Sequence, residues 1–121
     1  AVWRMTYVAR HELETICDVI QKTLDIERIY LFGSYAYGVP QADSDYDIYV
    51  VIPDDGPRPI TAMGNIRKAL LPIQARPLDV LVGYSSVFEK RTHWPSSLER
   101  EIAKKGVLLY GRNYSEQQRM A

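Results

Sequence analysis

The 121-residue sequence predicts an α/β (α+β) fold in which a small mixed β-sheet is flanked by helices. Two observations favour it. Short runs of apolar and β-branched residues, bounded by Gly or Pro, alternate with longer segments whose apolar residues recur at helical spacing. The length suits one hydrophobic core, and no internal repeat or low-complexity tract interrupts it. We therefore expect a single domain over residues 1–121.

The first half of the chain predicts a helix, two strands and a short turn between them. The helix covers about residues 6–24, where apolar side chains recur at helical spacing: Leu13, Ile16, Cys17, Ile20 and Leu24. A buried strand over residues 28–32 stops at Gly33-Ser34, and a short helical turn fits before the break at Gly38-Val39-Pro40. The second strand covers residues 46–52 and ends at Pro53.

The second half predicts a helix, a strand, two further helices and an edge strand. The helix is marked by apolar residues at Met63, Ile66, Leu70 and Ile73. The third strand, residues 78–82, is expected to close at Gly83. Two serine–glutamate pairs have the capping-box spacing and predict helix starts: Ser86 with Glu89, and Ser96 with Glu99. The last helix is expected to end in a left-handed cap at Gly106, before an edge strand over residues 107–110.

The composition excludes several classes of protein. Fifteen basic and fifteen acidic residues give zero formal net charge, which argues against a protein that follows a nucleic-acid template or lies on an anionic membrane. No apolar stretch approaches the ~18 residues of a membrane span, and no signal peptide is recognisable. Cys17 is the single cysteine, so neither a disulfide framework nor a cysteine-built metal site is expected. These features predict a cytoplasmic protein. Residues 1–4 precede Met5 and fit either an expression remnant or an extended start.

Three features of the chain combine into one candidate site. Gly33-Ser34 ends the first strand, where a glycine lets a ligand approach the backbone. Asp45 and Asp47 open the second strand, and alternation places their side chains on one face, roughly 6.5 Å apart along the backbone. Asp79 lies within the apolar third strand, where a carboxylate needs a partner.

Clustered carboxylates indicate a site for hard cations. Mg²⁺ prefers oxygen ligands and is often completed by substrate phosphates, and two such ions about 3.5–4 Å apart serve phosphoryl transfer. The Gly-Ser turn would hold the terminal phosphates of a nucleoside triphosphate. Each piece alone has a plainer explanation, such as a simple turn, an Asx-turn or an Asp79–Arg76 pair. Their combination favours the catalytic interpretation.

The same residues carry a resemblance to a known family. Leu31-Phe32-Gly33-Ser34, followed ten residues later by Asp45-Tyr46-Asp47 and an apolar run, resembles the signature of the DNA polymerase β-type nucleotidyltransferase superfamily. More narrowly, it is similar to the minimal nucleotidyltransferases (MNT) of bacteria and archaea. Asp79 matches the third carboxylate of that family in order and in strand context. The resemblance covers residues 29–52 and 78–82, and residues 102–110 resemble the end of such small domains.

The resemblance implies a polymerase β-like core and a defined chemistry. Mg²⁺ or Mn²⁺ would be held by Asp45, Asp47 and Asp79, with Asp79 also helping to deprotonate the acceptor hydroxyl. Gly33 and Ser34 would bind the triphosphate. The implied reaction transfers a nucleoside monophosphate, expected to be AMP from ATP, to a hydroxyl group and releases pyrophosphate.

The length leaves no room for a domain that binds the acceptor, so a partner protein or a second copy of the chain is expected to supply that site. In minimal members of the family the partner is often a small helical toxin of the higher-eukaryote-and-prokaryote nucleotide-binding (HEPN) class. The resemblance thus implies an antitoxin that attaches AMP to a tyrosine of the toxin. Two alternatives stay open: an antitoxin that acts by binding alone, and transfer to a small hydroxyl compound such as an antibiotic, with the acceptor cleft formed by a homo-oligomer.

Several other residues are weaker candidates. The basic side chains of Arg58, Arg67, Lys68 and Arg76 flank the predicted site and would neutralise triphosphate charge if they faced it. Tyr35 and Tyr37 follow the Gly-Ser turn and are candidate contacts for a base or a partner.

Overall fold

A four-stranded sheet forms the centre of the computed structural model, which describes residues 6–38 and 45–112. The strand order is β3-β2-β1-β4, and the strands are β1 (Arg28–Phe32), β2 (Tyr46–Ile52), β3 (Leu78–Tyr84) and β4 (Val107–Gly111). β1 is antiparallel to β2 and to β4, and β2 is parallel to β3. The mixed sheet flanked by helices confirms the predicted fold class. The predictions for residues 1–4 and for the break at Val39-Pro40 lie outside the described residues.

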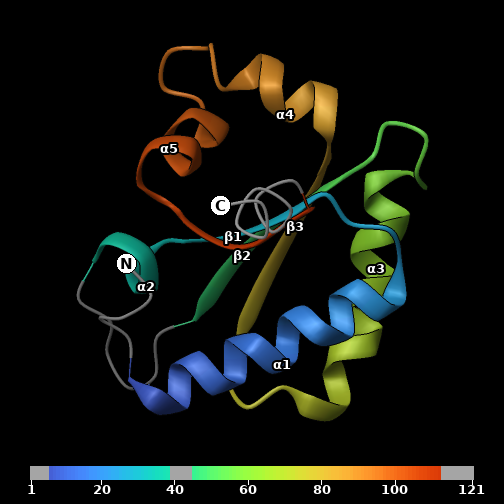
Figure 1. Ribbon diagram of the computed structural model, residues 1–121, viewed down its shortest axis with the longest axis vertical. Helices are drawn as coiled ribbons and strands as arrows, with labels where there is room; N and C mark the ends of the chain where they lie inside the picture. Colours follow the sequence, from blue (N-terminus) through green and yellow to red (C-terminus); the bar gives the residue numbers. More distant parts are fainter. Residues whose placement is uncertain (1–5, 39–44, 113–121) are drawn as a thin grey trace, which may run out of the picture.

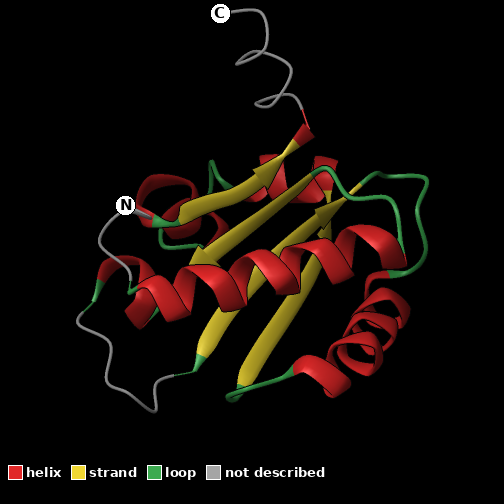
Figure 2. Ribbon diagram, turned by 60° about the horizontal axis from the view of Figure 1, so that its bottom comes forward, coloured by secondary structure: helices red, strands yellow, loops and turns green. Residues whose placement is uncertain are grey.

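The helices lie on both faces of this sheet, as Figures 1 and 2 show. α1 (Tyr7–Thr23) and α3 (Pro59–Leu70) cover one face, and α3 continues into a 3₁₀ turn, Leu71–Ile73. α4 (Ser85–Arg91) and α5 (Leu98–Lys105) lie on the other face, while the single-turn helix α2 (Ser34–Tyr37) follows β1 directly. Within the described ranges, no helix is both long and apolar enough to cross a bilayer.

Side-chain alternation along the strands divides the core into two layers. On β2, Tyr46, Ile48 and Val50 belong to the core beneath α1 and α3, whereas Tyr49 and Val51 pack with Phe88 of α4 on the opposite face. By the same alternation the odd-numbered residues at the start of β2 face the α4 and α5 side. This parity decides on which face of the sheet the predicted acidic site lies.

Two predictions about the region after β2 are wrong. Gly83 lies within β3 and does not close it, since a Cβ there would lie 3.2 Å from Cζ of Tyr49 and closer still to its hydroxyl. The glycine therefore makes room for the tyrosine ring. The N-cap of α4 is Tyr84, and no serine side chain caps it. The backbone N–H of Ser86 donates instead to Oδ1 of Asp54, 2.9 Å away, so the cap comes from a distant loop.

The predictions at both ends of α5 also need correction. The N-cap is Ser97, one residue later than Ser96, and its Oγ accepts a 3.0 Å hydrogen bond from the N–H of Arg100. Glu99 is buried and accepts a hydrogen bond from the Tyr49 hydroxyl, 3.0 Å away, so it does not complete a capping box. Gly106 is extended, with φ −68° and ψ 165°; glycine is needed because a Cβ would lie 2.6 Å from the carbonyl oxygen of Ile102.

Candidate active site

The sheet register brings the predicted acidic residues to one place. Asp47 of β2 lies directly opposite Asp79 of β3 in the parallel pair, so both side chains lie on the same face. On its other side, Asp47 is paired with Phe32, the last residue of β1. Gly33 comes next in the chain and therefore lies against the Asp47 side chain. Three segments that are far apart in sequence meet at this end of the sheet (Figure 2).

Gly33 is required both by its backbone conformation and by the space available. Its φ is 77° and its ψ is −155°, a region that is almost exclusive to glycine. A Cβ built on it would lie 3.0 Å from Cγ of Asp47 and closer still to Oδ2. The Gly-Ser turn and the Asp47 carboxylate are thus in direct contact. The sequence analysis predicted that these two features belong to one site.

The electrostatics of Asp47 reflect both of the other acidic residues. Burial raises the pKa of Asp47, and the charges of Asp79 and Asp45 together with a hydrogen bond to Asp79 raise it further. Asp45 and Asp79 are exposed, whereas Asp47 is half-buried. Because the Asp47 and Asp79 side chains are close enough to share a hydrogen bond, a proton or a bound cation between them is favoured.

The residues fit an oxygen-ligand cation by chemistry, although no metal geometry is preformed. Within residues 6–38 and 45–112, no three carboxylate, imidazole or thiol groups converge closely enough to constitute a ready metal site. Carboxylate oxygens are nevertheless the ligands that Mg²⁺ and Mn²⁺ prefer. The raised pKa of Asp47 is the response expected of such a cluster without a cation.

A polar cluster that the sequence did not predict lies on the opposite face of the sheet, directly behind Asp45 and Asp47. Its members are Glu12, Tyr35, Tyr46 and Arg76. Arg76 binds Glu12 through two hydrogen bonds, Nε to Oε2 at 3.0 Å and Nη2 to Oε1 at 3.2 Å. The hydroxyl of Tyr46 donates to the same Oε2 at 2.7 Å, and Nη1 of Arg76 donates to the Tyr35 hydroxyl. We refer to these four residues as the Glu12–Arg76 cluster.

The cluster is fully paired and its charges are mutually stabilised. Burial raises the pKa of Glu12, but hydrogen bonds from Arg76 and Tyr46 outweigh it, so the net pKa is lowered. Hydrogen bonding to Glu12 raises the pKa of Arg76, which therefore stays charged. The Arg76 guanidinium also lies 5.0 Å from the ring centre of Tyr46. No local spacing signals these contacts, since Glu12 and Arg76 are 64 residues apart.

The weaker sequence candidates are dispersed by the fold. The ion pair of Arg76 is with Glu12, on the face away from the Asp47 side chain. Arg58, Arg67 and Lys68 are exposed on or next to α3, the helix that covers that same opposite face. Tyr35 points to Arg76, whereas Tyr37 remains 42% exposed at the end of α2. Of the two tyrosines, Tyr37 keeps the surface position expected of a residue that contacts a base or a partner.

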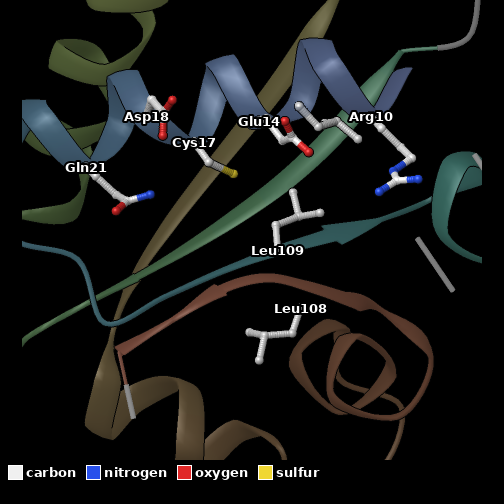
Figure 3. Close-up of a pocket in the computed structure, with 8 residues that line it drawn as sticks. Arg10, Glu14, Cys17, Asp18, Gln21, Leu108 and Leu109 are labelled. Atoms are coloured by element: carbon white, nitrogen blue, oxygen red, sulfur yellow. The ribbon is translucent and has the colours of Figure 1, made fainter. Parts of the chain in front are cut away.

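A cavity of about 250 Å³ opens between α1 and β4, and Asp45, Asp47 and Asp79 are not among the residues that line it (Figure 3). Leu13, Cys17, Leu108 and Leu109 supply its apolar lining. Burial raises the pKa of the Cys17 thiol to about 12, so the thiol stays protonated and is a poor nucleophile. None of the predicted site residues lines this cavity.

Comparison with protein families identifies the fold and its general activity. The family model described as "Polymerase beta, Nucleotidyltransferase" matches residues 14–115. The chain belongs to this family. The match spans the Gly33-Ser34 turn and all three aspartates, and it confirms the resemblance seen in the sequence. The chain is thus a nucleotidyltransferase domain.

Solved structures share the fold at low sequence identity. A toxin–antitoxin structure with AMP-PNP is 21% identical. The match covers 87% of this chain and 77% of the chain in that structure, with a TM-score of 0.60. A Sulfolobus solfataricus protein assigned as a nucleotidyltransferase is 21% identical, with coverages of 85% and 80% and a TM-score of 0.60. A structure of a tri-AMPylated Shewanella oneidensis HEPN toxin in complex with an MNT antitoxin is 17% identical. The match covers 90% of this chain and 77% of that chain, with a TM-score of 0.51. No curated protein matches the sequence significantly.

Proposed function

We propose that this nucleotidyltransferase transfers AMP from ATP to a hydroxyl group, that the acceptor is a tyrosine of a HEPN-type partner protein, and that the modification makes the chain an antitoxin. One observation carries the catalytic part of the proposal. The Asp47 carboxylate lies against the Gly33 backbone and opposite Asp79, so predicted phosphate-binding and cation-binding groups share one site.

Each residue of the site has a defined part in the proposed reaction. Gly33 has no side chain, so its backbone lies in contact with the Asp47 carboxylate, and the proposed triphosphate site adjoins this contact. Ser34 supplies a hydroxyl donor beside it. Asp45 directly precedes β2 and Asp47 is its second residue, and both would hold Mg²⁺ or Mn²⁺ together with Asp79, which pairs with Asp47 across the sheet. When bound, the cation supplies charge neutralisation for the triphosphate and the leaving pyrophosphate.

Asp79 is the residue proposed to receive the proton of the acceptor hydroxyl. Its side chain is exposed, so an acceptor from a second molecule can reach it. The raised pKa of the neighbouring Asp47 belongs to the site without a cation, and a bound cation would favour the charged form of Asp47. The exposure of Asp79 supports its proposed role as the group that takes the acceptor proton.

The identity of the acceptor rests on different support. The MNT antitoxin that shares this fold is complexed with a HEPN toxin carrying AMP, and a toxin–antitoxin relative contains AMP-PNP. These relatives support ATP as the substrate and a HEPN-type protein as the partner. The described residues build one sheet and its helices around the site, and the acceptor is expected to come from the partner.

A transfer assay tests the proposal. The native chain is incubated with labelled ATP, Mg²⁺ and a HEPN-type partner protein, for which the product of the neighbouring gene is the first choice. We expect label on a tyrosine of the partner, no label with the Asp45→Ala/Asp47→Ala variant, and no label after chelation of the metal. Absence of transfer by the native chain, or equal transfer by the double variant, would contradict the proposal.

Growth protection separates catalysis from binding alone. If AMP transfer neutralises the partner, Asp47→Ala loses protection although it still binds the partner in a pull-down. Full protection by Asp47→Ala would instead establish an antitoxin that acts by binding, with an idle site.

A further inference from the structure

We propose that the Glu12–Arg76 cluster is a positioning device that holds the three segments of the active site in one frame. The inference rests on the proposed function of that site. The cluster contacts no substrate, because it lies on the α1 side of the sheet while Asp47 faces the α4 and α5 side. Its role is to fix the direction in which the catalytic side chains point.

Every segment of the site has a cluster member beside it in the chain. Tyr35 directly follows Ser34, Tyr46 lies between Asp45 and Asp47, and Arg76 comes three residues before Asp79. All three contact Glu12 or its partner Arg76. Glu12 itself belongs to α1, the longest helix of the described chain. The three segments are therefore tied to one rigid element through a single ion pair.

The anchor at Tyr46 acts where the sheet provides little support. β2 begins at Tyr46, and at this residue the ladder pairs it with Leu78 of β3, whereas β1 reaches only to the level of Asp47. Asp45 lies beyond the ladder altogether. Successive side chains of a strand point to opposite faces, so fixing the Tyr46 side chain fixes the directions of Asp45 and Asp47. Its hydroxyl bond to Glu12 and its 1% exposure hold it in place.

The anchor at Tyr35 acts on the Gly-Ser turn in the same way. α2 is a single turn, too short to be stable by its own hydrogen bonds. The Tyr35 hydroxyl accepts from Arg76, and the Tyr35 ring packs against that of Tyr46 with centres 4.7 Å apart. The turn after β1 and the start of β2 are thereby locked to each other.

The chemistry of the cluster suits orientation better than simple stabilisation. The Glu12–Arg76 ion pair is partly buried, and even a fully buried pair would stabilise a core no better than apolar side chains of the same volume. A two-bond arginine–carboxylate contact adds directional constraint that apolar packing lacks. Here that constraint is applied at the point where the three site segments converge.

Removal of single hydroxyls tests the inference, because it leaves the ion pair and the packing in place. Tyr46→Phe and Tyr35→Phe are compared with two matched controls on the same sheet. Tyr49→Phe removes a buried hydroxyl that donates to a glutamate, and Tyr30→Phe removes a hydroxyl that accepts from an arginine. Neither control belongs to the cluster. Thermal unfolding checks that each cluster variant and its matched control lose a similar amount of stability.

The decisive readout is the affinity for Mn²⁺ in the presence of AMP-PNP, measured from the spin-resonance signal of free Mn²⁺. It requires no acceptor and no turnover. We expect Tyr46→Phe and Tyr35→Phe to bind Mn²⁺ about tenfold more weakly than the native chain, the effect typical of losing a residue that orients metal ligands. Tyr49→Phe and Tyr30→Phe should bind like the native chain.

The outcomes distinguish this inference from the proposed function. Native affinity in Tyr46→Phe, or an equal loss in Tyr49→Phe, overturns the positioning role and leaves the proposed function standing. Native protein that binds no Mn²⁺ with AMP-PNP overturns the proposed function and the inference with it. In the transfer assay, the cluster variants should lower kcat more than Tyr49→Phe and Tyr30→Phe at matched stability, because a loss of folded protein would lower the apparent kcat of these controls equally.

Discussion

Replacing Gly33 by alanine perturbs the backbone and the Asp47 carboxylate at once. The native conformation, φ 77° and ψ −155°, is one that residues with a side chain rarely adopt. The added methyl group would lie 3.0 Å from Cγ of Asp47 and closer still to Oδ2. Because the turn is held from both sides, the Asp47 carboxylate has to rotate away or the turn has to refold.

The expected magnitude follows from these two effects. A residue forced into such a backbone region costs about 1–3 kcal/mol, which for a chain of this size lowers the melting temperature by roughly 4–12 °C. Rotation of the Asp47 carboxylate removes a predicted cation ligand from its position. Metal-ligand displacement lowers metal affinity and activity by about 10–100-fold. Gly33→Ala should thus lower both stability and function.

Gly64→Ala provides a matched control with the opposite sign. Gly64 lies within α3, and a Cβ there would meet nothing within 4 Å. Alanine in place of an exposed helical glycine stabilises by about 0.5–1 kcal/mol. Circular dichroism melts and Mn²⁺ binding in the presence of AMP-PNP measure both variants side by side.

The two readouts refute different parts of the reasoning. A Gly33→Ala protein that melts like the native chain shows that the turn relaxes without strain. A destabilised Gly33→Ala protein with native Mn²⁺ affinity shows that the contact with Asp47 has no functional role. A loss of Mn²⁺ affinity in Gly64→Ala would mean that the assay reports general disturbance of the fold.

Four further substitutions test the electrostatics and the capping. Burial raises the pKa of Glu12, but its hydrogen bonds from Arg76 and Tyr46 outweigh burial and lower the net pKa. Its stabilising effect therefore exists above the unfolded pKa and is lost as the pH falls through the folded pKa, so urea unfolding should show Glu12→Gln destabilised at about pH 7, by an amount that shrinks as the pH is lowered. Burial and two neighbouring carboxylates raise the pKa of Asp47, so in metal-free protein Asp47→Asn should raise the melting temperature at about pH 7, by an amount that shrinks as the pH falls and the native carboxyl takes up its proton. Asp54→Ala should cost about 1 kcal/mol in urea unfolding by removing the α4 cap, whereas Ser86→Ala should change stability by less than about 0.5 kcal/mol.

Local patterns in the sequence determined the elements and the residues of the site. Periodicity and the Gly and Pro breaks predicted all four strands, and the structure begins β1 and β2 at the expected residues. The Gly-Ser turn and the three aspartates were found because their chemistry is unusual at those places in strands. The errors at Ser86, Ser96 and Gly106 have different causes. At α4 a tertiary contact, from the Ser86 N–H to Asp54, replaced the predicted local cap. At α5 the caps are local, but they lie at Ser97 and at an extended Gly106.

Only the tertiary structure decided how the site is held together. The register that sets Asp47 opposite Asp79, and the contact of Gly33 with Asp47, depend on pairing between strands that are distant in sequence. The role of Glu12 and Arg76 was invisible for the same reason, because a pair separated by 64 residues leaves no local periodicity. The sequence by itself therefore determined which chemical groups the protein possesses, while long-range pairing decided which of them meet.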